Sequence, residues 1–127
     1  MNVLLMDDDP AVLEIGRRML EFLGHRVVTA VDGEEAIRFF REQNSRETPI
    51  EVLILDLTIR GGSGGLETLN RIMEIDRSIP AIVTSGYSGD AVMADFRNYG
   101  FAAALSKPFG IRDLERALGE AVPLSTA

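Results

Sequence analysis

The sequence predicts an α/β domain with a parallel five-stranded sheet and helices on both faces. Short runs rich in leucine or β-branched residues alternate with longer segments of helical period, five times along the chain, which is the pattern of a (βα)5 unit. The short runs are almost continuously apolar, as expected of strands covered on both faces. A length of 127 residues with 46% hydrophobic residues fits one domain with a substantial core.

The predicted strands are residues 3–6, 27–31, 52–55, 81–84 and 102–105. The fifth run is mostly alanine, which prefers helix, so its assignment depends on its place in the alternation. We expect helices near residues 10–23, 36–40, 66–75, 92–99 and 111–121. The domain should then occupy residues 1–122 and be followed by a C-terminal tail, residues 123–127.

The first helix has the clearest signals. Asp9 is a favourable N-cap, Pro10 suits the first turn, and Gly24 suits the stop. Val12, Ile15, Met19 and Phe22 form an apolar stripe along this helix.

Composition excludes several functions. The chain has no cysteine, which rules out disulfides, zinc-cysteine sites and thiol nucleophiles and fits a reducing compartment. A formal charge of −7 argues against binding to nucleic acid or to a membrane surface. The longest uncharged run, residues 78–89, is too short to span a bilayer, and the N-terminus has no secretory signal. We therefore expect a cytoplasmic domain without membrane contact.

Polar residues gather at the ends of the predicted strands. They are Asp7, Asp8, Asp56, Ser85 and Lys107. If the strand order is 2-1-3-4-5, strands one and three are neighbours, and ligands bind beyond the carboxyl ends of strands in such sheets. The three carboxylates would then converge, with the serine and the lysine on the other side.

Three close carboxylates repel one another unless a cation neutralises them. Oxygen ligands without histidine or cysteine favour Mg²⁺, which also uses phosphate oxygens as ligands. Lys107 could then contact the phosphate as a point charge and Ser85 as a hydrogen-bond donor, while Asp56 could be the nucleophile that carries a phosphoryl group.

Four strings of the sequence resemble the motifs of receiver domains of two-component response regulators. They are residues 3–10 (VLLMDDDP), 52–58 (VLILDLT), 82–86 (IVTSG) and 106–109 (SKPF), and the similarity spans nearly the whole chain. Residues 84–109 further resemble receiver domains of hybrid sensor histidine kinases. The resemblance implies a flavodoxin-like, doubly wound sheet in the order 2-1-3-4-5.

The resemblance also implies roles for individual residues. Asp56 would be the phosphoacceptor, and Mg²⁺ would be bound by Asp8, Asp56 and the backbone carbonyl of Thr58, with Asp7 acting through water. Lys107, followed by a cis peptide bond, would be the family's lysine. Ser85 would be the hydroxyl residue instead of Thr84, because it lies five residues after Pro80 and directly before Gly86.

The chain departs from the family at two positions. Many members have proline four residues after the phosphoacceptor, where this chain has Arg60, and a flexible glycine run, residues 61–65, follows. Many members place an aromatic switch residue three positions before the lysine, where this chain has Ala104, which puts the usual switch in doubt. Tyr87, two residues after Ser85, should hinder the attacking water and slow dephosphorylation.

The implied function is that of a phosphoacceptor regulatory domain, not an enzyme with its own substrate. Its partner would be a sensor histidine kinase or a histidine phosphotransfer protein, and kinase activity would require a longer hybrid chain. The alternatives are a degenerate receiver that acts only as an interaction module, a Mg²⁺-dependent aspartyl-phosphate phosphatase and a flavin binder. The sequence leaves the oligomeric state open.

Overall fold

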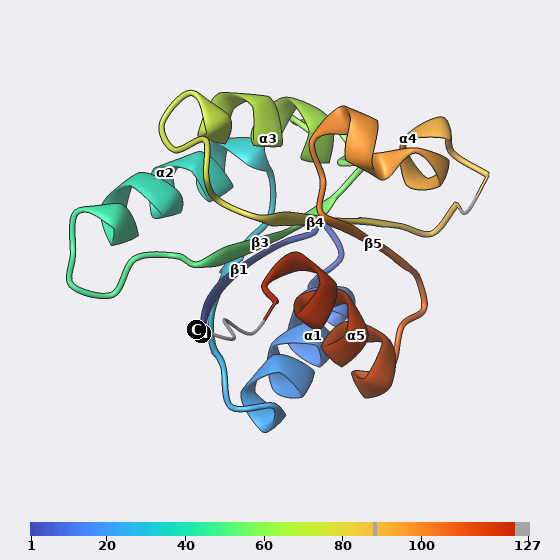
Figure 1. Ribbon diagram of the computed structural model, residues 1–127, viewed down its shortest axis with the longest axis horizontal. Helices are drawn as coiled ribbons and strands as arrows, with labels where there is room; N and C mark the ends of the chain where they lie inside the picture. The colour runs from blue at the N-terminus through green and yellow to red at the C-terminus, as the bar shows by residue number, and fades with distance from the viewer. Residues whose placement is uncertain (88, 124–127) are drawn as a thin grey trace.

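A five-stranded parallel sheet in the order β2-β1-β3-β4-β5 forms the centre of the computed structural model, which describes residues 1–87 and 89–123. The strands are β1 (Asn2–Met6), β2 (Arg26–Ala30), β3 (Val52–Asp56), β4 (Ala81–Ser85) and β5 (Ala103–Ser106). Helices α2, α3 and α4 lie on one side of the sheet, and α1 and α5 lie on the other (Figure 1). The predicted fold class and strand order are confirmed. The last four residues of the predicted tail, 124–127, lie outside the described residues.

The five helices are α1 (Pro10–Phe22), α2 (Gly33–Asn44), α3 (Gly65–Met73), α4 (Ala91–Ala94) and α5 (Ile111–Ala121). Asp9 is the N-cap of α1, since its side chain accepts a hydrogen bond from the Ala11 N–H at 2.9 Å. Gly24 follows this helix with a φ of +92°, a left-handed conformation that favours glycine. No helix among the described residues is long and apolar enough to cross a membrane.

The prediction of one continuous helix over residues 92–99 is wrong. Helix α4 has only four residues and is followed by a separate 3₁₀ helix, η1 (Phe96–Tyr99). Asp95 lies between them with φ −130° and ψ 42°, and its carboxylate accepts hydrogen bonds from the Asn98 side chain at 2.9 Å. Such local side-chain contacts compete with regular helical hydrogen bonds, which explains the break.

The apolar stripe of α1 that is evident in the sequence is not the face that packs on the sheet. Ile15 and Phe22 are 58% and 78% exposed, whereas Gly16 and Leu20 face the sheet. A Cβ atom at Gly16 would lie 2.8 Å from Leu5 Cδ2, so a glycine there lets the helix approach β1 closely. The helix carries apolar residues on two sides. The core is formed mainly by the side with Leu20, and Met19 packs against its edge.

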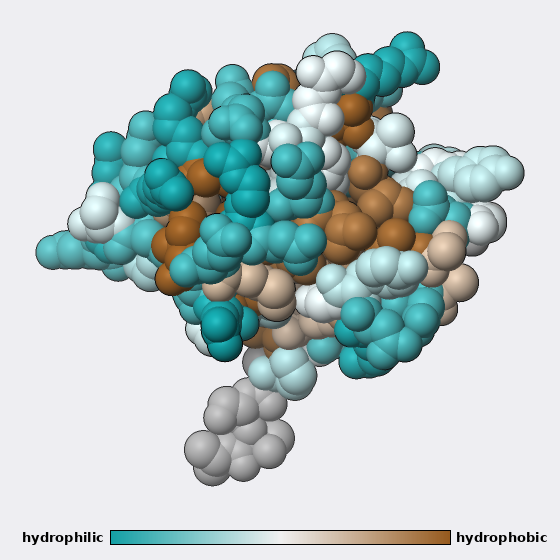
Figure 2. Space-filling model, turned by 90° about the horizontal axis from the view of Figure 1, so that it is seen from above, coloured by the Kyte–Doolittle hydropathy of each residue, from teal (hydrophilic) through white to brown (hydrophobic). Residues whose placement is uncertain are grey.

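Two hydrophobic cores sandwich the sheet. Successive residues of β1 alternate between them: Leu4 and Met6 contribute to the core under α2 and α3, and Val3 and Leu5 to the core over α1 and α5. Seen from above, the outer surface is mostly hydrophilic, with hydrophobic residues gathered in the middle of this face (Figure 2). The rigid double-sided packing fixes the strand ends, where the polar residues lie.

Candidate functional site

The register of β1 and β3 brings two carboxylates together. Met6 pairs with Leu55, so the next residues along the two parallel strands, Asp7 and Asp56, lie side by side at the carboxyl edge of the sheet. Both are buried, with 1% and 3% of their surface exposed. Asp8 joins them, and one carboxylate oxygen from each of the three residues lies within 4.8 Å of the others. The structure therefore forms the acidic cluster that the sequence predicts.

Lys107 supplies the positive charge at this edge. Ser85 pairs with Ser106 in the last register of β4 and β5, and the Lys107 N–H donates to the Ser85 carbonyl at 2.9 Å. The Lys107 Nζ atom lies 2.5 Å from Asp7 Oδ2 and 3.2 Å from Asp56 Oδ2. The Lys107–Pro108 peptide bond is cis, as the resemblance implied.

The negative charges of the cluster outnumber its positive charge. Burial and the neighbouring charge of Asp7 raise the pKa of Asp56, and Lys107 offsets this only in part. Burial alone would lower the pKa of Lys107, but its contacts with Asp7 and Asp56 raise it overall, so the lysine stays charged. Three carboxylates and one ammonium group leave a net charge of about −2 when all are ionised.

The donor set fits a divalent cation. Ligand oxygens on an octahedral Mg²⁺ are about 2.9 to 4.2 Å apart, since each lies about 2.1 Å from the ion. One oxygen of each carboxylate lies within 4.8 Å of the others, so the three groups are close enough to hold one ion directly or through water. A divalent ion would also cancel the excess negative charge.

The Ser85 hydroxyl is buried near the cluster but is engaged with its own loop. Its Oγ accepts from the Tyr87 N–H at 3.0 Å and lies 3.4 Å from the Tyr87 carbonyl. Within the described part of the chain, it makes no hydrogen bond to Asp56 or Lys107. The Tyr87 side chain is exposed and its ring lies over Gly89, where an added Cβ would be 3.6 Å from Cε1.

The remaining predicted residues lie around the rim. The Thr58 N–H is 3.4 Å from Asp56 Oδ1, and the Arg60 N–H donates to Asp8 Oδ2 at 3.1 Å. Arg60 also lines the cavity of about 460 Å³ over the acidic cluster. Ala104 is half-buried on β5 and packs against the core on the α2–α4 side, so no aromatic ring occupies this position.

The glycine run packs closely against the end of β3. A Cβ atom at Gly64 would lie 2.3 Å from the Leu57 carbonyl oxygen, and one at Gly65 would lie 2.9 Å from that of Asp56. We expected these glycines to give flexibility, but two of them serve a close backbone approach. They let α3 begin directly beside the phosphoacceptor candidate.

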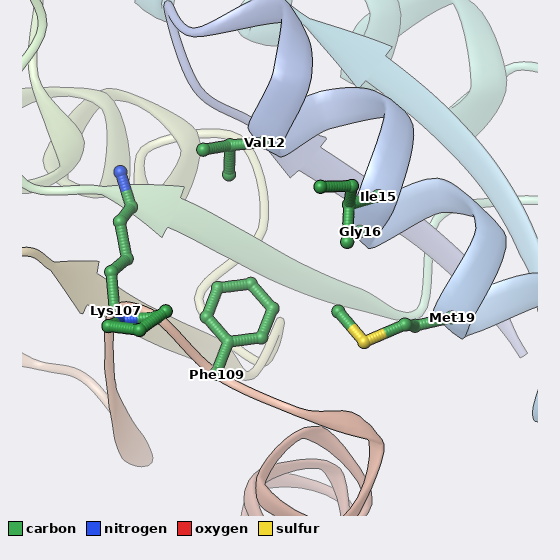
Figure 3. A pocket seen from close by; sticks show the side chains of 7 residues that line it. Val12, Ile15, Gly16, Met19, Lys107 and Phe109 are labelled. Carbon is green, nitrogen blue, oxygen red and sulfur yellow. The ribbon is translucent and has the colours of Figure 1, made fainter.

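An apolar groove beside the cluster was missed by the sequence reasoning. It has a volume of about 250 Å³ and is lined by Val12, Ile15, Gly16, Met19, Lys107, Pro108 and Phe109. Figure 3 shows the Phe109 ring facing the side chains of α1, with the Lys107 side chain extending beside it. The sequence does contain a signal for this groove. Leu13, Gly16, Leu20 and Leu23 form a second helical stripe. Because that stripe can fill the core, Val12 and Ile15 are left to line the groove.

The fold and the site together define a signalling receiver. The model of the response regulator receiver domain matches residues 3–119, and the chain therefore belongs to this family. It is a receiver domain of two-component systems, which is a regulatory domain. This assignment confirms the family that the four motifs resemble and sets aside the phosphatase and flavin-binding alternatives.

Individual relatives agree with the family assignment. The chain is 31% identical to the virulence sensor protein BvgS of Bordetella pertussis and 33% identical to the transcriptional regulatory protein PrrA of Mycobacterium leprae, over 96% and 89% of its own length. It spans 10% and 46% of those two proteins. A crystal structure of the response regulator TrrA from Thermotoga maritima, in complex with Mg(2+)-BeF, is similar with a TM-score of 0.80 and 25% identity, covering 95% of this chain and 98% of that one.

Proposed function

We propose that Asp56 accepts a phosphoryl group from a phosphohistidine of a sensor histidine kinase or a histidine phosphotransfer protein. A carboxylate oxygen of Asp56 attacks phosphorus, the P–N bond to the imidazole breaks, and the imidazole leaves with the bonding electron pair. The observation that carries the proposal is the position of Asp56, buried between two further carboxylates and 3.2 Å from the Lys107 ammonium group.

The acidic cluster would bind Mg²⁺ through Asp8, Asp56 and the Thr58 carbonyl, with Asp7 acting through water. When bound, the ion neutralises charge on the transferring phosphoryl group. The Mg(2+)-BeF complex of the similar response regulator TrrA supports this choice of ion. Lys107 would turn from Asp56 to a phosphoryl oxygen, a charge-assisted contact, while its second partner Asp7 keeps the ammonium group at the site.

The response to phosphorylation would pass through the β4–α4 loop. To reach a phosphoryl oxygen, the Ser85 hydroxyl has to leave the Tyr87 backbone, which rearranges that loop. Ala104 has no ring that could follow this movement, so the output surface differs from the usual aromatic switch. The new charge on phosphorylated Asp56 would shift the equilibrium toward the conformation with the rearranged loop.

The apolar groove beside Lys107 is the proposed contact surface for the phosphohistidine donor. Lys107 lines both the groove and the acidic cavity, so the two lie next to each other. An apolar helix face of the donor, seated against Ile15 and Phe109, would place a histidine next to it over Asp56. The remaining charge of the domain, −7 overall, favours a basic rim on that donor.

The similarity to BvgS supports a place within a hybrid sensor histidine kinase, with residues 1–122 as the receiver unit and a cytoplasmic location. The gene sequence on either side of this segment tests that placement. Phosphorylation itself is tested with acetyl phosphate and Mg²⁺, followed by intact mass. One acid-labile phosphoryl group on the wild type and none on Asp56→Asn supports the proposal, whereas equal labelling of both contradicts it.

A further inference from the structure

A backbone hydrogen bond ties together two loops that flank the acidic cluster. The Arg60 N–H, in the loop after β3, donates to Asp8 Oδ2 in the loop after β1, at 3.1 Å and 52 residues apart in the chain. Lys107 pairs with Asp7 and Asp56. Among the described residues, Asp8 forms no ion pair, so the Arg60 N–H is its contact from across the site.

The surroundings of Arg60 hold this N–H in place. Ile59 is buried in the core directly before it, and Gly61, directly after it, turns the chain with a φ of +70°. Gly64 then returns the loop to the Leu57 carbonyl. Residue 60 is therefore fixed at a turn between a buried side chain and a close backbone contact.

This contact depends on the identity of residue 60. Proline lacks an N–H and cannot donate to Asp8, whereas any other residue can. The departure of this chain from the proline-containing pattern therefore adds a hydrogen-bond donor to the site, in addition to a positive charge. The Arg60 guanidinium group is exposed and forms no ion pair within the described part of the chain, so the donor and the charge are separable.

We propose that Arg60 is a positioning residue whose backbone N–H orients the Asp8 carboxylate for a divalent cation. A carboxylate has two oxygens, so Oδ2 can accept the N–H while Oδ1 binds the ion. Hydrogen bonds of this outer-shell kind fix the orientation of metal-binding carboxylates, and their loss typically lowers metal affinity by about 10- to 100-fold. The inference rests on the proposed function, because it assigns the cation of that same site.

Two variants separate the donor from the charge. Arg60→Ala removes the guanidinium group and keeps the N–H, and Arg60→Pro removes both. In a Mg²⁺ titration of the full chain, followed by amide NMR shifts without any phosphoryl donor, we expect Arg60→Ala to stay within about two-fold of the wild type. We expect Arg60→Pro to bind about 3- to 10-fold more weakly, a smaller loss than usual because Asp8 is partly exposed to water.

Equal affinities of Arg60→Ala and Arg60→Pro would overturn the proposal, as would a wild type that binds no Mg²⁺. Thermal unfolding shows whether the proline variant is folded. If it is not, hydrogen exchange of the Arg60 amide in the wild type decides, because the proposal requires protection both without and with Mg²⁺. A wild type that binds Mg²⁺ but accepts no phosphoryl group would contradict only the proposed function.

Discussion

Replacing Asp56 with asparagine should stabilise the protein in the absence of Mg²⁺. The change removes one negative charge from a buried cluster and keeps the shape of the side chain and an oxygen that can accept hydrogen bonds. Because burial and the charge of Asp7 raise the pKa of Asp56, the folded protein favours the neutral form of this residue. Asparagine resembles that neutral form.

The size of the effect follows from the distances. At an effective dielectric constant of about 20, a carboxylate within 4.8 Å of Asp56 repels it by at least about 3.5 kcal/mol, and Lys107 at 3.2 Å attracts it by about 5 kcal/mol. Before screening, the two repulsions exceed the attraction by at least about 2 kcal/mol, and solvent around the more exposed Asp8 reduces this difference. Desolvation of Asp56 acts in the same direction as the repulsion. We expect Asp56→Asn to raise the free energy of unfolding by about 1–2 kcal/mol.

Urea unfolding followed by circular dichroism at neutral pH measures this difference. The destabilising charge is present above the folded-state pKa of Asp56, so the advantage of the variant should shrink as the pH falls through that pKa toward the usual value of 3.8. Saturating Mg²⁺ should also shrink it, because the ion binds the wild type more tightly. A variant that is less stable than the wild type in EDTA at neutral pH would refute this reasoning.

Three further predictions concern the loops and the groove. Tyr87→Ala should shorten the lifetime of the aspartyl phosphate if the ring hinders the attacking water, and equal decay rates in a phosphate-release assay would contradict this. Ile15→Asp should slow transfer from a phosphohistidine donor about 5- to 10-fold, while Phe22→Asp, on the same helix but outside the groove, should not. Similar rates for the two variants with a cognate donor would exclude the groove as the contact surface. Gly64→Ala should cost about 1–3 kcal/mol of stability, whereas Gly119→Ala, where nothing lies within 4 Å of the added methyl group, should cost none; equal melting temperatures would contradict the close approach.

Much of the fold could be predicted because alternation and local signals agree. The Asp9 cap, the Gly24 stop and the buried strands all have a local cause in the sequence. The buried face of α1 could not be predicted in this way, since the helix has two apolar stripes of similar strength. Gly16 favours burial of the stripe that contains it, because a residue without a side chain lets the helix lie close to Leu5.

The sequence was enough to predict which residues gather at the candidate site, but not which hydrogen bonds they form there. Parallel strands end at a common edge, so the convergence of Asp7 and Asp56 follows from the strand order alone. The hydrogen bond from Arg60 to Asp8 depends on the path of a glycine-rich loop, and the Ser85 hydroxyl could face either its own loop or the cluster. Such choices are made by tertiary packing, which a sequence pattern does not contain.

The central claim is that Asp56 is the phosphoacceptor of a Mg²⁺-dependent reaction. Incubation with acetyl phosphate, with Mg²⁺ or with EDTA, and intact mass spectrometry before and after acid treatment tests it most directly. We predict that the wild type gains the mass of one phosphoryl group only with Mg²⁺, that acid removes it, and that Asp56→Asn gains none. Labelling in EDTA, or equal labelling of the asparagine variant, would contradict the claim.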